Sequence, residues 1–301
     1  MANRQIRRAV TIRDALFLLL ACLFAAAIIV PMLARVRIIP NRVTCWAHLS
    51  TVGKGMLIYA SDYEDELPRA GGRESVWAAR TPAWMAEDRS QAFGMASDGT
   101  GGRAGISASL YLLVKYVEIK PRYFLCIDSE GGYERGASEF HPAKYGIRDT
   151  ALTDLWDFGP NPPLHCSYAY QMVYSSHRLS ITGEPAMVIA GDRNPWMDSP
   201  STRARDFSRF KADLPPGAAT GDDRRYGNAV SHEGNGQNVL FLDSHVEFLK
   251  RPFSRIDDDN IYTRWNDGDK IRGVPPALGM MPADPDDSFL VNDPAWTNER
   301  E

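Results

Sequence analysis

The sequence predicts an α+β protein in which a long N-terminal helix, first transmembrane and then amphipathic, packs on an antiparallel β-sheet. Three observations support this prediction. An uncharged apolar stretch occupies residues 15–34, apolar residues then recur at helical spacing, and short β-like runs follow in the rest of the chain. Runs of helix followed by runs of strand are typical of α+β folds with antiparallel sheets.

The composition is that of a globular protein. The 301 residues are 44% hydrophobic and 24% charged, with a formal net charge of −4. These proportions match ordinary folded domains, and the acidic excess argues against a nucleic-acid partner. Without the apolar segment and its flanks, about 240 residues remain, enough for one large or two small domains.

Residues 15–34 are long enough to cross a membrane. They read ALFLLLACLFAAAIIVPMLA, without charge, between Asp14 and Arg35. At about 1.5 Å per residue, such a helix covers the ~30 Å hydrocarbon core of a bilayer. Residues 1–14 form a basic lead, and four arginines before the span against three after it favour a cytoplasmic N-terminus. The sequence thus predicts a single-pass inner-membrane protein, with the lipid bilayer as partner and a periplasmic, extracytoplasmic C-terminal domain.

Two processing alternatives compete with a retained anchor. A cleavable signal peptide needs a basic lead, a short apolar core and a small-residue site, which residues 25–27 offer. The apolar run continues past that site, which favours retention. Leu19–Cys22 superficially resembles a lipoprotein box, but a lipidated Cys22 would be followed by further apolar residues instead of a polar tether.

Two prolines lie within the predicted N-terminal helical region. Pro31 is expected to kink the span without ending it, because neighbouring groups can satisfy the freed carbonyls. Pro40 is expected to place a second bend, after which Asn41 caps a new helix.

An amphipathic continuation of the helix is predicted over residues 35–66. Apolar residues recur there at spacings of three and four, at Cys45, Leu49, Val52, Met56, Tyr59 and Tyr63. Gly53 and Gly55 each weaken a helix by roughly 1 kcal/mol, unless they permit the close approach of a sheet. An acidic run before Pro68 ends the helix.

The extracytoplasmic α+β head is predicted over residues 67–250. Residues 69–104 are rich in Gly, Ala, Arg and Ser and predict a long surface loop, with a short helix near Trp77–Met85. Residues 107–118 predict a second helix, because their apolar residues share one face.

Five short β-like runs follow in the head: Tyr123–Ile127, Ser167–Tyr174, Ala186–Ala190, Asn238–Leu242 and His245–Leu249. The last two predict a hairpin with its tight turn at Asp243-Ser244. Residues 251–301 hold many Asp and Pro residues and predict an extended, surface-hugging tail, with a short strand at 260–263.

The sequence AVTIRDAL, which begins at Ala9, resembles a degenerate type IV prepilin N-terminus. In that motif a glycine precedes Phe-Thr-Leu-Ile-Glu-Leu and a long apolar helix. Asp14 falls where the Glu sits and Pro31 where pilins place a helix-kinking proline, whereas Ala9 replaces the glycine and Val10 the Phe. The resemblance implies that Asp14 meets the N-terminal amine of a neighbouring subunit during assembly. The alternative is a boundary residue in the lipid headgroups.

Further segments resemble the prepilin-type, pseudopilin-like proteins of planctomycetes that carry a His-x9-Asp-Gly region. They lie in order at Arg42–Asp62, Leu110–Tyr116, Phe124–Cys126, Ser167–Tyr170, Ile189–Asp192 and Asp258–Thr263. His232 and Asp243 correspond to the name-giving pair, with ten residues between them and Ser244 in place of the Gly. The resemblance implies a pilin-like fold and a non-enzymatic, membrane-anchored structural component of a type II secretion or type IV pilus-like system. Such a protein associates with itself or with other pseudopilins through its N-terminal helix. The alternative is a solitary membrane-tethered module that binds a metal or a surface ligand.

His232, Asp243, His245 and Asp192 are the candidate metal ligands. Histidine and carboxylate sets suit zinc or iron, and oxygen sets suit calcium. The resemblance adds Ca²⁺ as the first ion to test, since some major pseudopilins bind calcium in C-terminal loops. The interpretation that we favour is structural: Asp243 satisfies the amides of the turn and His232 hydrogen-bonds its loop. No nucleotide-binding or hydrolase motif argues for an enzyme.

Three cysteines lie outside the span, at Cys45, Cys126 and Cys166. A disulfide persists outside the cytoplasm. Cys126–Cys166 is the preferred pair because both residues lie beside predicted strands, and Cys45–Cys126 is the alternative.

Overall fold

The computed structural model describes residues 12–128, 137–200, 202–212, 223 and 225–295, and their side chains except at 31–40. The chain divides into two compact units, residues 1–41 and residues 42–301, and each is described by itself.

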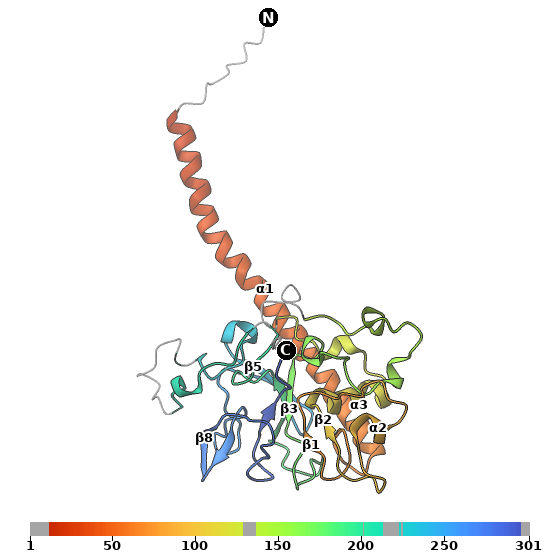
Figure 1. Ribbon diagram of the computed structural model, residues 1–301. Coiled ribbons are helices and arrows are strands. Elements are labelled where there is room, and N and C mark those ends of the chain that lie inside the picture. Colours follow the sequence, from red (N-terminus) through yellow and green to blue (C-terminus); the bar gives the residue numbers. More distant parts are fainter. Residues whose placement is uncertain (1–11, 129–136, 201, 213–222, 224, 296–301) are drawn as a thin grey trace, which may run out of the picture. The chain divides into compact units, whose positions relative to one another are not determined.

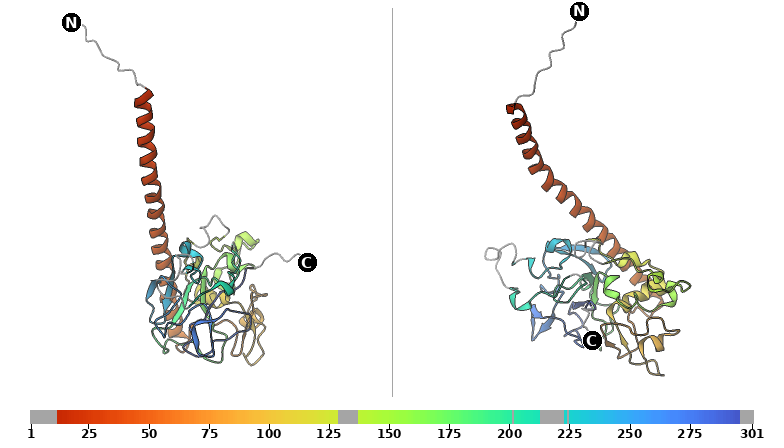
Figure 2. Two further views of the ribbon diagram at one scale, coloured as in Figure 1. Left: turned by 90° about the vertical axis from the view of Figure 1, so that its left-hand side faces the viewer. Right: turned by 45° about the horizontal axis from the view of Figure 1, so that its top comes forward.

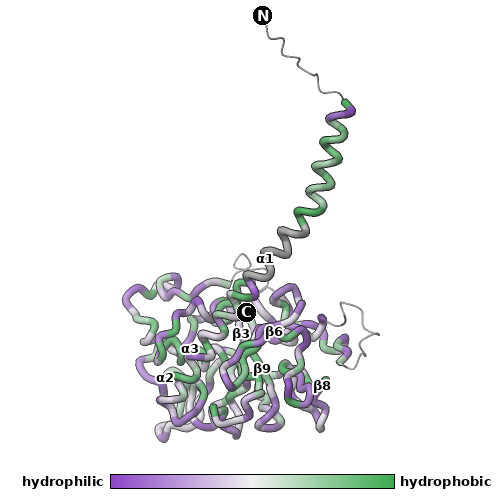
Figure 3. The backbone as a smooth tube through the Cα atoms, turned by 180° about the vertical axis from the view of Figure 1, so that it is seen from behind, coloured by the Kyte–Doolittle hydropathy of each residue, from purple (hydrophilic) through white to green (hydrophobic). Residues whose placement is uncertain are grey.

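The first element, α1, is one helix from Ile12 to Asp62. Its segment Ile12–Val30 is long and apolar enough to cross a membrane, and none of that segment is buried inside the structure. The hydrophobic colouring of this segment is clear in Figure 3. Its length and composition suit a membrane anchor and equally a signal sequence.

The two prolines of α1 do not divide it. Pro31 lies inside the helix, as expected, but the predicted new start at Asn41 is wrong, because α1 runs through this residue without interruption. A proline removes one backbone hydrogen bond, and a helix of 51 residues retains the others on both sides.

Within the second unit, α1 packs through the predicted apolar face. Five of the six residues of this face are buried: Cys45, Leu49, Val52, Met56 and Tyr59. A Cβ added at Gly53 would lie 2.6 Å from Cδ1 of Leu240 in strand β5, and one at Gly55 would collide with Ile119. The two glycines therefore permit a close approach that any larger side chain obstructs.

The main sheet has five strands in the order β6-β5-β4-β3-β9, and every neighbouring pair is antiparallel. Figure 1 labels two of these strands, β3 and β5. The strands are β3 (Tyr168–Gln171), β4 (Val188–Asp192), β5 (Gln237–Phe241), β6 (Val246–Leu249) and β9 (Leu290–Val291). The predicted β5–β6 hairpin is confirmed, with Leu240 opposite Val246. Ser244 in its turn has a φ of 71°, the left-handed conformation for which the expected Gly is suited.

Both faces of this sheet are buried. Tyr168, Tyr170 and Leu240 belong to a core that includes the apolar faces of α1 and α3 (Ile106–Val117). Ala169 and Val239, which alternate with them, belong to a second core. Burial on both faces explains why these strands read as continuous apolar runs.

The remaining elements are short. They are β1 (Val76–Trp77), α2 (Arg89–Phe93) and β2 (Arg103–Ala104), and the 3₁₀ helices η1 (Pro121–Phe124), η4 (Pro142–Tyr145), η5 (Leu152–Asp154), η6 (Pro162–Leu164), η7 (Phe207–Arg209) and η8 (Ser231–Gly234). The helix predicted near Trp77–Met85 is wrong, because the helix in this segment, α2, lies further along the chain at Arg89–Phe93. The rest of the segment is largely irregular, as a loop is, but Trp77 and Trp84 are buried and anchor it in the core. The strand predicted at Tyr123–Ile127 is wrong because Pro121 opens η1 there.

The C-terminal segment is part of the fold. It forms a hairpin of β7 (Arg264–Asn266) and β8 (Asp269–Val274), drawn in blue in Figure 2. It then forms β9, which pairs with β3 at the edge of the main sheet. The predicted surface-hugging tail over 251–301 is therefore wrong for its described part, and the strand predicted at 260–263 begins only at Arg264. Covering the open edge of β3 and burying Phe289 are the physical reasons for this docking.

Candidate functional site

Four buried side chains from distant parts of the chain converge at one point, which we call the Cys–His cluster. Cys45 comes from α1, Cys126 follows η1, Asp192 ends β4, and His232 lies in η8. Each is at most 3% exposed. Such convergence of thiol, imidazole and carboxylate groups away from water requires that they satisfy one another.

The sulfur and nitrogen atoms of the Cys–His cluster are in mutual contact. Sγ of Cys45 lies 2.8 Å from Sγ of Cys126, and Sγ of Cys126 lies 3.6 Å from Nε2 of His232. Their ligand atoms all lie within 4.8 Å of one another. The backbone N–H of Ile127 donates a hydrogen bond of 3.1 Å to Sγ of Cys45, an arrangement that favours a thiolate.

Two carboxylates hold the His232 ring. Nδ1 lies 3.0 Å from Oδ2 of Asp128, and Nε2 lies 3.2 Å from Oδ2 of Asp192. The same Oδ2 of Asp192 accepts a hydrogen bond of 2.7 Å from the backbone N–H of Asn238. Oδ1 of Asp192 is buried and has no hydrogen-bond partner in the part of the chain that the structure describes.

The backbone at His232 is strained. His232 has a φ of 56° and Glu233 a φ of 57°, the left-handed region that side chains other than glycine seldom adopt. Such strain typically costs 1–3 kcal/mol per residue and concentrates at functional sites. The surrounding contacts therefore hold the His232 ring in a fixed place against a local cost.

The electrostatics of the Cys–His cluster are unusual. Burial lowers the pKa of His232, but the carboxylates of Asp192 and Asp128 outweigh burial and raise this pKa to about 10. The hydrogen bond from Cys126 lowers the pKa of Cys45, against burial, which raises it. Burial raises the pKa of Cys126 well above its ordinary value. Cys126 is therefore the donor of the pair, and Cys45 is the readier thiolate.

The structure brings together only half of the predicted metal-ligand set. His232 and Asp192 meet, whereas Asp243 and His245 lie in the β5–β6 turn, where both are partly exposed. Oδ1 of Asp243 accepts hydrogen bonds from the backbone N–H and the ring of His245. Asp243 therefore stabilises the turn, as the structural interpretation predicts.

The preferred disulfide, Cys126–Cys166, is not formed, and all four cysteines are free. Sγ of Cys166 lies 3.8 Å from the carbonyl oxygen of Tyr168, while Sγ of Cys126 faces Cys45. The geometry thus favours the alternative pairing of thiols, Cys45 with Cys126.

The residues expected to act in processing and assembly lie in the first unit. Asp14 is in the first turn of α1 and Pro31 is inside it, whereas Ala9 and Val10 lie outside the described residues. Their roles stay predictions.

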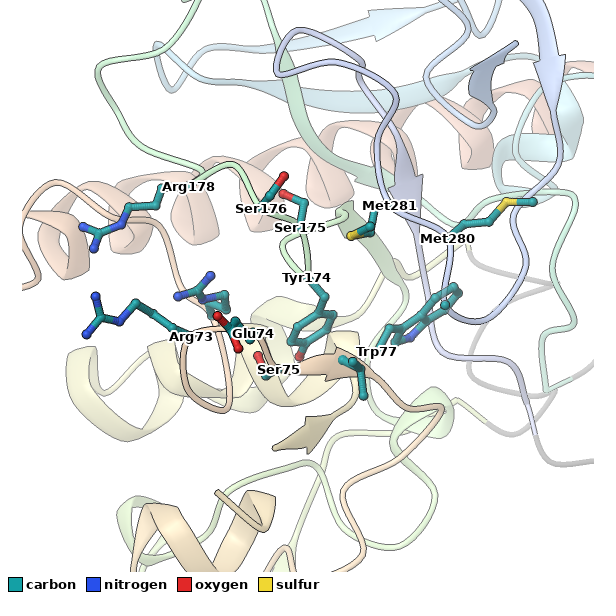
Figure 4. Close-up of a pocket in the computed structure, with 13 residues that line it drawn as sticks. Arg73, Glu74, Ser75, Trp77, Tyr174, Ser175, Ser176, Arg178, Met280 and Met281 are labelled. Atoms are coloured by element: carbon teal, nitrogen blue, oxygen red, sulfur yellow. The ribbon is translucent and has the colours of Figure 1, made fainter. Parts of the chain in front are cut away.

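A pocket of about 550 Å³ lies elsewhere in the second unit. Figure 4 shows the guanidinium groups of Arg73 and Arg178 at one end in this view, and Trp77 and Met280 at the other. The indole of Trp77 donates a hydrogen bond of 3.0 Å to Asp293, so its ring is fixed in place. Arginine at one end and apolar groups at the other suit a ligand with an acidic and an apolar part.

No family model, curated protein or solved structure matches the chain. The prepilin-type resemblance therefore stays a prediction, and the geometry of the sites carries the functional argument.

The sequence did not predict the Cys–His cluster as a unit. Cys45 and Cys126 were disulfide candidates, His232 and Asp192 were metal candidates, and Asp128 was not a candidate. A signal was present in the sequence, because both cysteines and Asp192 lie within the segments that resemble the pseudopilin-like proteins. Residues that share a pattern across distant segments are candidates for one common site.

Proposed function

We propose that the protein is a membrane-anchored, pseudopilin-like structural component with an extracytoplasmic head. The observation that carries the proposal is the composition of α1, whose first part is apolar and exposed and whose later part packs into a folded α+β unit. A helix of this kind tethers a folded head to a bilayer.

The exposed apolar side chains of α1 require a partner. Leu16, Phe17 and Phe24 are 58%, 74% and 71% exposed. Exposed apolar surface costs about 25 cal/mol per Å² in water, so a segment of this length is stable only in lipid or against other helices. Both partners belong to the proposal: the inner membrane, with a cytoplasmic N-terminus, and the same helices of neighbouring subunits.

Cysteine cross-linking tests the assembly part of the proposal. Single cysteines are placed along Leu16–Val30 in a Cys22→Ser background, and intact membranes are oxidised. A fibre subunit gives disulfide-linked dimers at positions that share one helix face, because one cysteine per chain forms one bond. Asp98→Cys, in an exposed loop of the head, is the matched control and is expected to stay monomeric. Monomer at every position of the span would contradict assembly.

The pocket beside Trp77 favours a second candidate function, a solitary tethered binding module. Its three arginines, Arg69, Arg73 and Arg178, and its aromatic wall suit an anionic ligand with an apolar part. Calorimetric titration with phenyl phosphate tests this candidate. Binding that Arg73→Glu weakens about tenfold would support it, since a charged hydrogen bond contributes about that factor. No detectable heat in the native chain would dismiss it.

A further inference from the structure

We propose that Cys45, Cys126 and His232 bind one zinc ion, and that the Asp192 carboxylate shifts towards the sulfurs to become its fourth ligand. This inference is independent of the proposed function, because it rests only on contacts inside the second unit. Two thiolates, an imidazole nitrogen and a carboxylate oxygen form a donor set that zinc accepts with four-fold coordination. Calcium, the ion favoured at first, takes six to eight oxygens and has no such set here.

Of three donor–donor distances in the Cys–His cluster, two fit a tetrahedral ion. Zn–S and Zn–N bonds of about 2.3 and 2.0 Å place sulfur and nitrogen about 3.6 Å apart in a tetrahedron. The Cys126 Sγ to His232 Nε2 distance is 3.6 Å, and His232 Nε2 to Asp192 Oδ2 is 3.2 Å. The two sulfurs, now 2.8 Å apart, must separate by about 1 Å to reach the S–S edge of such a site.

The surroundings of the Cys–His cluster resemble an outer ligand shell. Metal-bound histidine usually gives its second ring nitrogen to a carboxylate, which fixes the ring and its tautomer. Asp128 is that partner, 3.0 Å from Nδ1, so that Nε2 faces Asp192 Oδ2 at 3.2 Å, Asn238 Nδ2 at 3.2 Å and Cys126 Sγ at 3.6 Å. The Ile127 N–H hydrogen bond to Cys45 serves a thiolate ligand in the same way.

Asp192 supplies the independent evidence for a ligand. Its side chain is fully buried, and Oδ1 has no hydrogen-bond partner among the described residues. A buried carboxylate oxygen without a hydrogen-bond partner destabilises the folded state, and a nearby cation offsets that cost. A zinc ion held by His232 and Asp192 would supply a positive charge at Nε2 in place of a proton.

A Cys45–Cys126 disulfide is the competing outcome. It needs the sulfurs at about 2.05 Å and would remove both thiolates from any metal site. A disulfide would not account for the two carboxylates at His232, the unpaired Asp192 oxygen or the strained His232 backbone. A zinc ion uses both carboxylates, Asp192 as a ligand and Asp128 as the partner of Nδ1, and explains why the backbone holds the ring in place.

Zinc at this position joins four parts of the fold. Cys45 and Cys126 are 81 residues apart, and Cys126 and His232 are 106 apart. The ion would therefore cross-link α1 to the sheet and to the loop that carries His232.

The test measures zinc in the full-length chain, purified in detergent without reductant or chelator and then dialysed. We expect about one zinc per chain, lost in His232→Ala and in Cys126→Ser. His245→Ala and Cys166→Ser are the matched controls and are expected to retain zinc. Substitution of cobalt for zinc in the native chain should give the absorption band of a thiolate–cobalt bond, a readout that needs no variant.

Three outcomes would overturn the proposal. The first is a metal-free native chain in which mass spectrometry finds a Cys45–Cys126 disulfide. The second is zinc that His245→Ala removes and His232→Ala, folded by circular dichroism, retains. The third is a chain that binds cobalt without any thiolate band.

Discussion

Replacing Gly53 with leucine tests the close packing of α1 on the sheet. A Cβ at this position lies 2.6 Å from Cδ1 of Leu240, roughly 1 Å inside the normal contact distance. Leu240 is fully buried, so it cannot swing into solvent. Overpacking of this kind costs about 3 kcal/mol, and the better helix propensity of leucine returns about 1 kcal/mol. We expect the free energy of unfolding to fall by about 2 kcal/mol.

Urea-induced unfolding of the full-length chain in detergent micelles, followed by tryptophan fluorescence, measures this change. Lys54→Leu introduces the same side chain one position away, where Lys54 is exposed, and is expected to change stability by less than about 0.5 kcal/mol. Equal stability of Gly53→Leu and Lys54→Leu would refute the packing argument.

Three further changes have expected outcomes of different size. Burial and the charge of Asp293 raise the pKa of Asp157 to about 8, whereas an unfolded aspartate titrates near ~3.9. The stability due to the protonated carboxyl is therefore complete below about pH 4 and is lost as the pH rises towards about 8. Asp157→Asn should remove this loss, which amounts to about 1.4 kcal/mol per pH unit. The same pH dependence of the unfolding free energy in both chains would contradict the prediction. Leu290→Ala in β9, fully buried, should lower the free energy of unfolding by about 2–5 kcal/mol, whereas a loose tail would give no change in the same urea titration. Arg178→Ala, which breaks a half-exposed ion pair of 2.6 Å with Glu66, should cost less than about 1 kcal/mol in thermal unfolding, and a larger loss would mean that the pair is more than a surface contact.

Much of the fold follows from local patterns in the sequence. The apolar face of α1 and the β5–β6 hairpin were predictable because each depends on a periodicity or a turn within a few residues. Pairing of β9 with β3 was not, because β9 has only two residues and is defined by a partner far away in sequence. Pro121 allows two interpretations in sequence, because a proline shortly after a helix can stop it and can also open a 3₁₀ turn, as it does in η1.

The Cys–His cluster was predictable in its parts but not in its assembly. His232 and Asp192 attracted notice as metal-binding residue types, and Cys45 and Cys126 as a thiol pair. Only the folded chain shows that the β4 end and η8 bring the two pairs together. Asp243 and His245 have the same residue types, but a tight turn satisfies them locally.

Alkaline carbonate extraction of membranes from cells that express the full chain tests the central claim most directly. A helix that spans the bilayer through Ile12–Val30 keeps the head in the membrane pellet, and a Leu19→Lys, Phe24→Lys double variant should release it. Recovery of the unmodified chain, or of a shortened head without α1's apolar segment, in the carbonate supernatant would contradict the anchored protein proposed.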